Sequence, residues 1–317
     1  MGKKEIYIKS TNKVNDLHII IWEPDGEIKA ILQLSHGMVE YIDRYDRFAK
    51  FLNEKGILVV GNDHLGHGLT AKDDDELGYF PCDDKSATVV EDLHKITEEM
   101  KKKYKYVPYF VLGHSMGSFL IRRYIMTYGD EVDGAVIVGT GSQPKFLLKL
   151  GKILLKIIKS FKGEKYRSKF VTNIVFGTYN KQFKPVETES DWISRDREIV
   201  NKYVKDKYCT FLFTINGYET LFDVIEFIQN PNNEKNIPKK LPVIFISGDK
   251  DPVGNNGKGV KSIYENYKNI GIEDIDIKLY KDSRHEVLND LEYETVYEDI
   301  YNWLKVHLEN KEKSLNV

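Results

Sequence analysis

Cysteine is scarce in this chain, long apolar runs are missing, and neither sign of charge dominates. Only two cysteines occur among 317 residues, Cys82 and Cys209, without the spacing of a metal site or a redox pair. We therefore expect reduced thiols, as in a cytoplasmic protein. Basic and acidic residues number 47 and 49, so no charge excess points to nucleic acid as a partner.

Signals for secretion and for membrane insertion are also missing. No segment reaches the roughly 18 consecutive apolar residues that a membrane span requires. Residues 1–9 begin with charge and lack the apolar centre of a secretory signal. With 41% hydrophobic residues, the chain has an ordinary globular composition and enough length for one large core or two unequal domains. These features favour a cytoplasmic globular protein.

Strand-like and helix-like segments alternate along most of the chain. Apolar runs of strand length occur at residues 6–8, 17–22, 30–34, 57–60, 107–112, 135–138, 243–246 and 275–280. Helical spacing of apolar residues follows at about 43–55, 85–105, 118 onward, 257–270 and 290–308. This alternation predicts an α/β fold, in which helices cover both faces of a mostly parallel, eight-stranded sheet.

The pattern changes between residues 143 and 238, where several helical segments but few strand-like runs occur. An insertion this long is not a loop, so we expect a helical cap over the strand C-terminal ends, with residues 1–142 and 239–317 forming the core. Residues 145–162 carry an apolar stripe: Leu147, Leu150, Leu154, Ile157, Ile158 and Phe161. This face either packs on the core or makes transient contact with a membrane surface, and we favour packing.

The pentapeptide Gly113-His114-Ser115-Met116-Gly117 lies between the strand at 107–112 and a helical run that begins at 118. This arrangement is typical of a nucleophile elbow, in which a strained strand-to-helix turn exposes the serine hydroxyl. Flanking glycines allow neighbouring backbone to pass closely. Ser115 is therefore the predicted nucleophile.

A nucleophilic serine needs a base, and the base needs an acid that orients it. Both residue types follow strands on the same sheet edge as Ser115. Asp249 and Asp251 follow residues 243–246, and we prefer Asp251 because Asp249 would cap the turn itself. His285 follows residues 275–280 and is the predicted base, whereas His307 falls inside the terminal helix.

Stabilisation of an oxyanion requires two N–H donors. Met116 supplies one at a helix N-terminus, and Met38 in the loop His36-Gly37-Met38 supplies the second. His36, Gly37 and His114 are the residues that we expect to contact substrate. No cofactor or metal is expected, because His64 and His67 belong to a glycine-rich turn.

Several motifs together resemble the monoacylglycerol lipase and lysophospholipase branch of the serine α/β-hydrolases. They are His36-Gly37-x-x-Glu40 with Arg44-Tyr45, Asp63-His64-x-Gly66-His67-Gly68, the elbow through Ser118, Gly248-x-x-Asp251-x-Val253, His285-Glu286, and the cap segment 191–196. The resemblance implies the α/β-hydrolase fold, the triad Ser115, Asp251 and His285, and hydrolysis of a lipophilic ester such as a monoacylglycerol or lysophospholipid. Tyr41 and Thr70 depart from the usual pattern, which leaves head-group preference open. Glu40 and Arg44, at helical spacing, are interpreted as a surface ion pair.

The same residues are also compatible with other functions. The same triad serves thioesterases, peptidases, acyltransferases and perhydrolases, and a noncatalytic binding module could keep the fold. Epoxide hydrolases and dehalogenases of this fold are disfavoured, because they use a carboxylate where this chain has Ser115. Acyl length, positional preference and oligomeric state are left open by the sequence.

Overall fold

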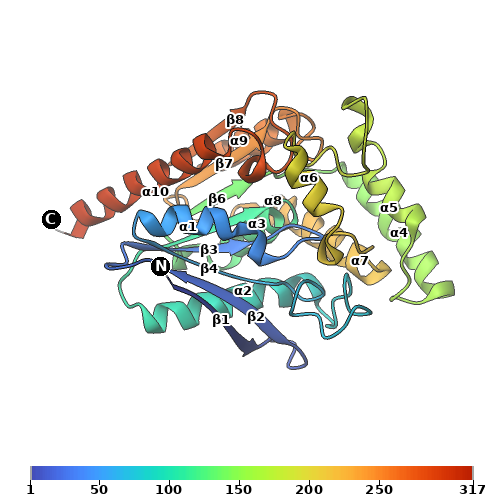
Figure 1. Ribbon diagram of the computed structural model, residues 1–317, viewed down its shortest axis with the longest axis horizontal. Coiled ribbons are helices and arrows are strands. Elements are labelled where there is room, and N and C mark those ends of the chain that lie inside the picture. Colours follow the sequence, from blue (N-terminus) through green and yellow to red (C-terminus); the bar gives the residue numbers. More distant parts are fainter. Residues whose placement is uncertain (1, 316–317) are drawn as a thin grey trace.

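A single eight-stranded sheet forms the centre of the molecule (Figure 1). The computed structural model describes residues 2–315, and side chains as far as residue 311. The strands lie in the order β1-β2-β4-β3-β5-β6-β7-β8. Their bounds are β1 Gly2–Lys9, β2 Asp16–Glu23, β3 Ala30–Ser35, β4 Ile57–Asn62, β5 Tyr109–His114, β6 Gly134–Val138, β7 Val243–Gly248 and β8 Ile275–Tyr280. Pairing is parallel from β4 to β8, while β1 and β2 pair antiparallel, which confirms the predicted fold class.

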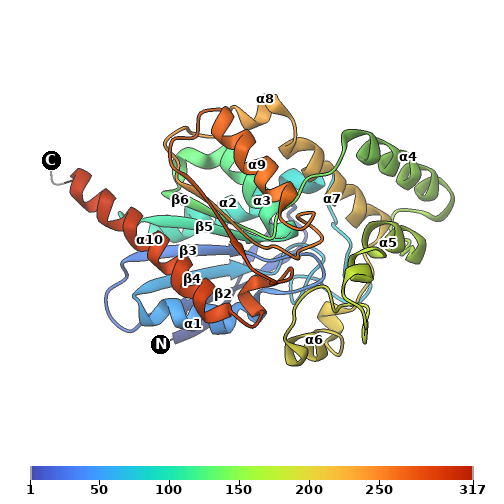
Figure 2. The same ribbon diagram turned by 90° about the horizontal axis from the view of Figure 1, so that it is seen from above.

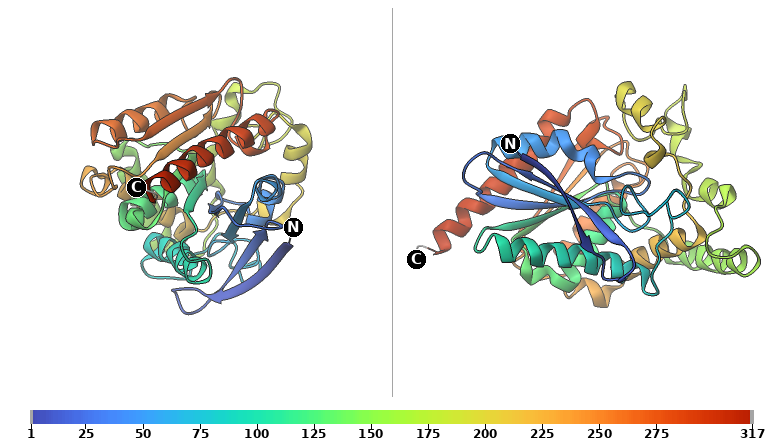
Figure 3. Two further views of the ribbon diagram at one scale, coloured as in Figure 1. Left: turned by 90° about the vertical axis from the view of Figure 1, so that its left-hand side faces the viewer. Right: turned by 60° about the horizontal axis from the view of Figure 1, so that its bottom comes forward.

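Helices cover both faces of this sheet (Figures 2 and 3). Those that pack on the sheet are α1 Asp46–Glu54, α2 Lys85–Lys103, α3 Met116–Tyr128, α9 Lys258–Asn269 and α10 Tyr293–Leu315. Successive strand residues alternate between the two cores: Ile31 packs with α2, α3 and α9, whereas Leu32 packs with α1 and α10. The predicted strands and helices are therefore confirmed, with ends that differ by a few residues.

Between β6 and β7 the chain forms helices and no strand of the sheet (Figure 2). These are α4 Lys145–Lys162, α5 Lys169–Phe176, α6 Arg197–Tyr203, α7 Ile215–Ile228 and α8 Pro231–Glu234. Helices α4 and α5 lie at the end of the molecule opposite helix α10 (Figure 1). No helix within residues 2–315 is both long enough and apolar enough to cross a bilayer.

The apolar stripe of α4 does not pack as we expected. Leu148 and Leu155 are buried, whereas Leu150 and Phe161 are 58% and 82% exposed. The buried residues form a seam with Gly151, where an added Cβ would strike Phe222 of α7. One residue along a helix is a rotation of 100°, so a seam at 148, 151 and 155 turns most of the predicted stripe away from the core. The expectation of packing is wrong for the four exposed residues of the stripe, Leu147, Leu150, Ile157 and Phe161, whereas Ile158 packs against the core.

Candidate active site

Ser115 lies at the turn between β5 and α3, with φ 54° and ψ −120°. A positive φ is strained for serine and is held by close backbone packing on both sides. A Cβ on Gly117 would clash with the Ser35 carbonyl, and one on Gly113 with the backbone of Gly117. The serine side chain remains half-buried and lines a cavity. This is the geometry that the pentapeptide predicts.

The strand-end loops bring Asp251 and His285 together. His285 Nδ1 lies 2.9 Å from Asp251 Oδ2, and the two residues are 3% and 0% exposed. Asp251 also accepts hydrogen bonds from the Val253 amide and from Ser247 Oγ. Asp249 instead accepts the Asp282 amide at 2.8 Å. Of the two aspartates, Asp251 is therefore the one beside the imidazole.

The histidine of the terminal helix α10 belongs to a different part of the molecule. His307 contacts the Trp303 carbonyl and Asp274. It is absent from the cavity lining that contains His285.

Ser115 and His285 line one cavity of about 870 Å³. Within residues 2–315, no hydrogen bond joins their side chains. Hydrogen bonds between catalytic groups often form or tighten only when substrate is bound. The missing bond therefore agrees with a histidine that acts as base once substrate has entered. Two rings pack against the imidazole: His114 at 4.7 Å and Trp192, from the insertion, at 4.9 Å between centroids.

Most of the cavity wall is apolar and comes from the helical insertion. It includes Leu148, Leu154, Phe176, Phe213, Leu221 and Phe222. Four glutamates also line it: Glu40, Glu187, Glu189 and Glu286. Among the described residues, no lysine or arginine does so. The cavity therefore suits an apolar chain and offers no lysine or arginine to an anionic group.

The loop after β3 carries the expected second oxyanion donor. Gly37 and Met38 line the cavity together with Met116. The Gly37 amide donates to Glu40 Oε1 at 2.5 Å. Within residues 2–315, neither the Met38 nor the Met116 amide donates to another protein group, so both remain available to a ligand.

His36 lies beneath this loop and does not line the cavity, contrary to the expected substrate contact. Its Nδ1 donates to the Gly37 carbonyl at 2.7 Å, and its Nε2 accepts the His64 amide at 3.0 Å. Both ring nitrogens are therefore used by backbone. Burial lowers the pKa of His36 to about 3, which keeps the ring neutral.

His64 and His67 pack around His36, with ring centroids at 4.1 and 5.1 Å. Burial lowers the pKa of His67 to about 4 and that of His64 well below its usual range. Within the described part of the chain, no group of three or more histidines, cysteines or acids could hold a metal ion. The histidines thus form a neutral packed cluster under the loop.

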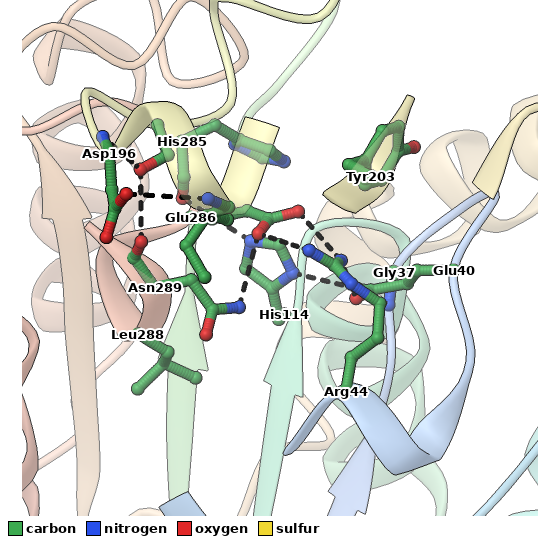
Figure 4. A network of polar contacts seen from close by, with 12 residues as sticks. Gly37, Glu40, Arg44, His114, Asp196, Tyr203, His285, Glu286, Leu288 and Asn289 are labelled. Carbon is green, nitrogen blue, oxygen red and sulfur yellow. Dashed lines mark hydrogen bonds and ion pairs between the residues drawn. The ribbon is translucent and has the colours of Figure 1, made fainter. Parts of the chain in front are cut away.

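Glu40 and Arg44 do not form the surface pair that their spacing predicts. Glu40 is 3% exposed, and Arg44 bridges it to a second buried carboxylate, Glu286, the residue after His285 (Figure 4). Both guanidinium nitrogens reach Glu286, at 2.7 and 2.8 Å. Burial alone would raise the pKa of Glu40, but Arg44 and His114 hold it below its usual range. The local spacing of Glu40 and Arg44 could not indicate this buried bridge, because Glu286 lies 242 residues from Arg44 in the sequence.

His114 faces two acceptors. Its Nδ1 lies 3.1 Å from Glu40 Oε1 and its Nε2 lies 3.4 Å from the His285 carbonyl oxygen. A protonated ring satisfies both, because each partner can only accept. Burial is the largest single influence and opposes the charge, but the hydrogen bond to Glu40 together with the negative charges of Glu40, Glu286 and Asp251 raises the pKa of His114. Besides lining the cavity, His114 therefore joins the two loops that flank Ser115.

A sheet of this topology, with a strained serine at the β5–α3 turn and an Asp–His pair at the neighbouring strand ends, defines a serine hydrolase of the α/β-hydrolase fold. Residues 26–292 match the model of the family described as serine aminopeptidase, S33. The chain belongs to that family.

Relatives of similar length carry lipase names. The chain is 25% identical over 298 residues to a monoacylglycerol lipase of Mycolicibacterium smegmatis, covering 91% of this chain and 92% of that one. It is also 25% identical over 290 residues to the monoglyceride lipase of Homo sapiens, covering 89% and 84%.

Solved structures agree with this family. A thermostable carboxyl esterase from Bacillus coagulans, in complex with glycerol, has a TM-score of 0.90 and 29% identity, with 97% of this chain and 99% of that one covered. A monoglyceride lipase variant from Saccharomyces cerevisiae, in complex with a substrate analogue, has a TM-score of 0.77 at 20% identity, with 97% and 96% covered, and supports the fold alone.

Proposed function

We propose that this carboxylic ester hydrolase cleaves monoacyl lipids by an acyl-enzyme mechanism with Ser115 as nucleophile. The carrying observation is that His285, held by Asp251, lines the same apolar cavity as Ser115. The names of relatives and of the esterase with a similar structure support ester hydrolysis.

The geometry supports a two-step reaction. His285 takes the proton of Ser115 as the oxygen attacks the ester carbonyl, and Asp251 keeps the Nδ1–H tautomer and stabilises the imidazolium. The Met38 and Met116 amides hold the oxyanion. His285 then protonates the departing alcohol. It next activates a water molecule, which releases the fatty acid from Ser115 and restores the enzyme.

The charge of the cavity favours a neutral head group. Arg44 compensates Glu40 and Glu286. Of the other two lining glutamates, Glu187 has only an exposed ion pair and Glu189 has none among the described residues. No lysine or arginine lines the cavity among those residues, so a phosphate would meet repulsion from these two carboxylates. A glycerol head group has no charge and offers hydroxyls to carboxylates. We therefore favour monoacylglycerols over lysophospholipids, which the sequence left as equal alternatives.

One observation favours a second candidate, release of an N-terminal residue from a peptide. The same glutamates would attract a substrate ammonium group, and the family description names an aminopeptidase. The apolar wall from α4 and α7 argues for an acyl chain instead. Hydrolysis of aminoacyl p-nitroanilides, compared with that of monoacylglycerols, separates the two.

Residues 143–238 are proposed to act as a cap over this site, and α4 and α5 to contact a lipid surface. Phe146, Phe161, Phe170 and Ile174 are more than half exposed on these helices. Exposed lysines such as Lys149 and Lys156 flank them. An apolar face bordered by lysines matches an anionic lipid interface.

The assignment of the nucleophile is tested by a fluorophosphonate probe and by substitution. The probe should label wild-type protein at Ser115, and Ser115→Ala should lower turnover of a p-nitrophenyl ester on the order of 10⁴-fold or more. Ser160→Ala, which changes an exposed serine of α4 that does not line the cavity, is the control and should keep its labelling. Unchanged turnover in Ser115→Ala would reject the mechanism.

A further inference from the structure

Val39, the residue after the proposed oxyanion donor Met38, has an unusual backbone conformation. Its φ is 57°, in the left-handed region that β-branched residues rarely adopt. Strain of this kind persists only where the surroundings fix the backbone from several sides. The contacts of Val39 therefore show what holds the oxyanion loop.

Both backbone polar groups of Val39 are bonded, each to a side chain from a different part of the molecule. The N–H donates to His67 Nε2 at 3.3 Å, and the carbonyl accepts the Tyr203 hydroxyl at 2.9 Å. His67 Nδ1 lies 3.0 Å from the Leu65 carbonyl, so the ring proton is on Nδ1 and Nε2 accepts. Burial raises the pKa of Tyr203, which keeps its hydroxyl protonated as a donor.

The preceding peptide unit is fixed as well. His36 Nδ1 donates to the Gly37 carbonyl, and the Gly37–Met38 peptide is trans. Carbonyl and N–H point in opposite directions in a planar trans peptide, so fixing this carbonyl aims the Met38 N–H. Of the N–H groups of residues 37–39, only that of Met38 donates to no group within residues 2–315.

We propose that Tyr203 is a positioning residue for the reaction: its hydroxyl, on helix α6 of the insertion, fixes Val39 and so keeps the Met38 N–H aimed at the oxyanion. This inference rests on the proposed function. Arg44 Cζ also lies 5.0 Å from the centroid of the Tyr203 ring. This contact connects Tyr203 to the network of Glu40 and Glu286 (Figure 4). The insertion therefore completes the oxyanion site besides lining the cavity.

A second hydroxyl joins the same two segments without touching the oxyanion loop backbone. Tyr41 donates to Asp206 Oδ2 at 2.7 Å, three residues beyond Tyr203. Tyr41→Phe removes this link and leaves both bonds of Val39 in place. It is the matched control for Tyr203→Phe, which removes only the bond to the Val39 carbonyl and keeps the ring over Arg44.

The test compares the two variants with the wild-type enzyme on p-nitrophenyl butyrate, an ester without a glycerol group. Tyr203→Phe should lower kcat about tenfold, less than loss of a whole oxyanion donor, with KM changed by less than about twofold. A trifluoromethyl ketone, which forms a tetrahedral oxyanion on serine, should bind Tyr203→Phe about tenfold more weakly. Tyr41→Phe should stay within about twofold in all three measurements.

Each other outcome has one meaning. Unchanged kcat and ketone affinity in Tyr203→Phe would overturn the inference. So would a defect confined to monoacylglycerols, because the hydroxyl would then contact the head group. A drop in melting temperature well beyond roughly 2–4 °C, matched by loss of circular dichroism, would assign Tyr203 a role in folding and also reject positioning. Wild-type protein that neither hydrolyses the ester nor reacts with a fluorophosphonate would instead reject the proposed function.

Discussion

Two regions of the molecule depart from the usual arrangement of side chains, in opposite directions. At the strand-end rim, charged and polar residues such as Glu40, Glu286 and His36 are buried. On α4 and α5, large apolar residues such as Phe161 and Phe170 are exposed. Buried charge and exposed apolar surface both cost free energy unless a partner compensates them.

The difference lies in where the compensation comes from. At the rim the partners are internal: Arg44 bridges both carboxylates, and His36 uses both ring nitrogens on backbone. On α4 and α5 the chain supplies lysines around the apolar residues but no covering element among the described residues. The buried charges of the rim are thus compensated within the chain, whereas the exposed apolar residues of α4 and α5 would need a partner outside it.

Removal of the shared cation should have the largest effect. Arg44→Leu leaves Glu286 buried without a counter-charge and Glu40 with His114 alone, and it should lower the free energy of unfolding by about 3–5 kcal/mol. Urea denaturation measures it. Arg47→Leu is the control, because Arg47 is exposed and stacks on Tyr293, and it should cost less than about 1 kcal/mol. A loss below 1 kcal/mol in Arg44→Leu would mean that the rim tolerates unpaired charge.

The two kinds of environment can be compared within one helix. Leu155 of α4 is 1% exposed, and Leu155→Ala should cost about 2–4 kcal/mol through lost packing. Ile153, two residues earlier, is 49% exposed, so Ile153→Ala should stay within about 0.5 kcal/mol. Equal losses in thermal or urea unfolding would show that the outward face of α4 is packed in solution.

Acid should weaken the rim through its neutral histidines. Unfolded histidine binds a proton near pH 6.5, whereas burial lowers the pKa of His36 to about 3 and of His67 to about 4. Between these values the unfolded state holds more protons than the folded state. Each histidine therefore lowers the free energy of unfolding by about 1.4 kcal/mol for every unit by which the pH is lowered. Urea midpoints from pH 6.5 to 4.5 measure this slope. His67→Gln should reduce it by about one proton, and an unchanged slope would contradict the assignment.

Changes on the α4–α5 face should affect stability least and lipid contact most. Phe146→Ser with Phe161→Ser should change the free energy of unfolding by less than about 0.5 kcal/mol. Binding to vesicles that contain anionic lipid should fall roughly tenfold, as apolar area is lost. Tyr106→Ser removes an aromatic residue that is 99% exposed before β5 and should leave vesicle binding unchanged. Equal binding by all three proteins would reject the lipid contact.

Much of the fold follows from local pattern in the sequence. Strand-length apolar runs and helical spacing locate each strand of the sheet and the helices that cover it, because period and length are local properties. The elbow at Ser115 and the order of Asp251 and His285 likewise depend on short motifs next to strands. These features could be predicted before any tertiary contact was known.

Other features depend on contacts between distant segments. The spacing of Glu40 and Arg44 indicates a pair, but Glu286, which makes it a buried bridge, lies 242 residues from Arg44. Periodicity predicts an apolar stripe on α4, but it does not show which side of that helix packs against α7. Tyr203 ends a seven-residue helix in a region without strands, and no local signal marks its contact with Val39.

The insertion leaves the sheet after β6 and returns before β7, so a relative's version could be grafted between the same two strands. Such a transplant would replace the apolar cavity wall while leaving the strand-end residues of the recipient in place. Trp192, whose ring lies against His285, and Tyr203 would have to travel with the graft or be restored in it. Chimeras that keep these two aromatic residues should therefore inherit new chain-length preferences without losing catalytic rate.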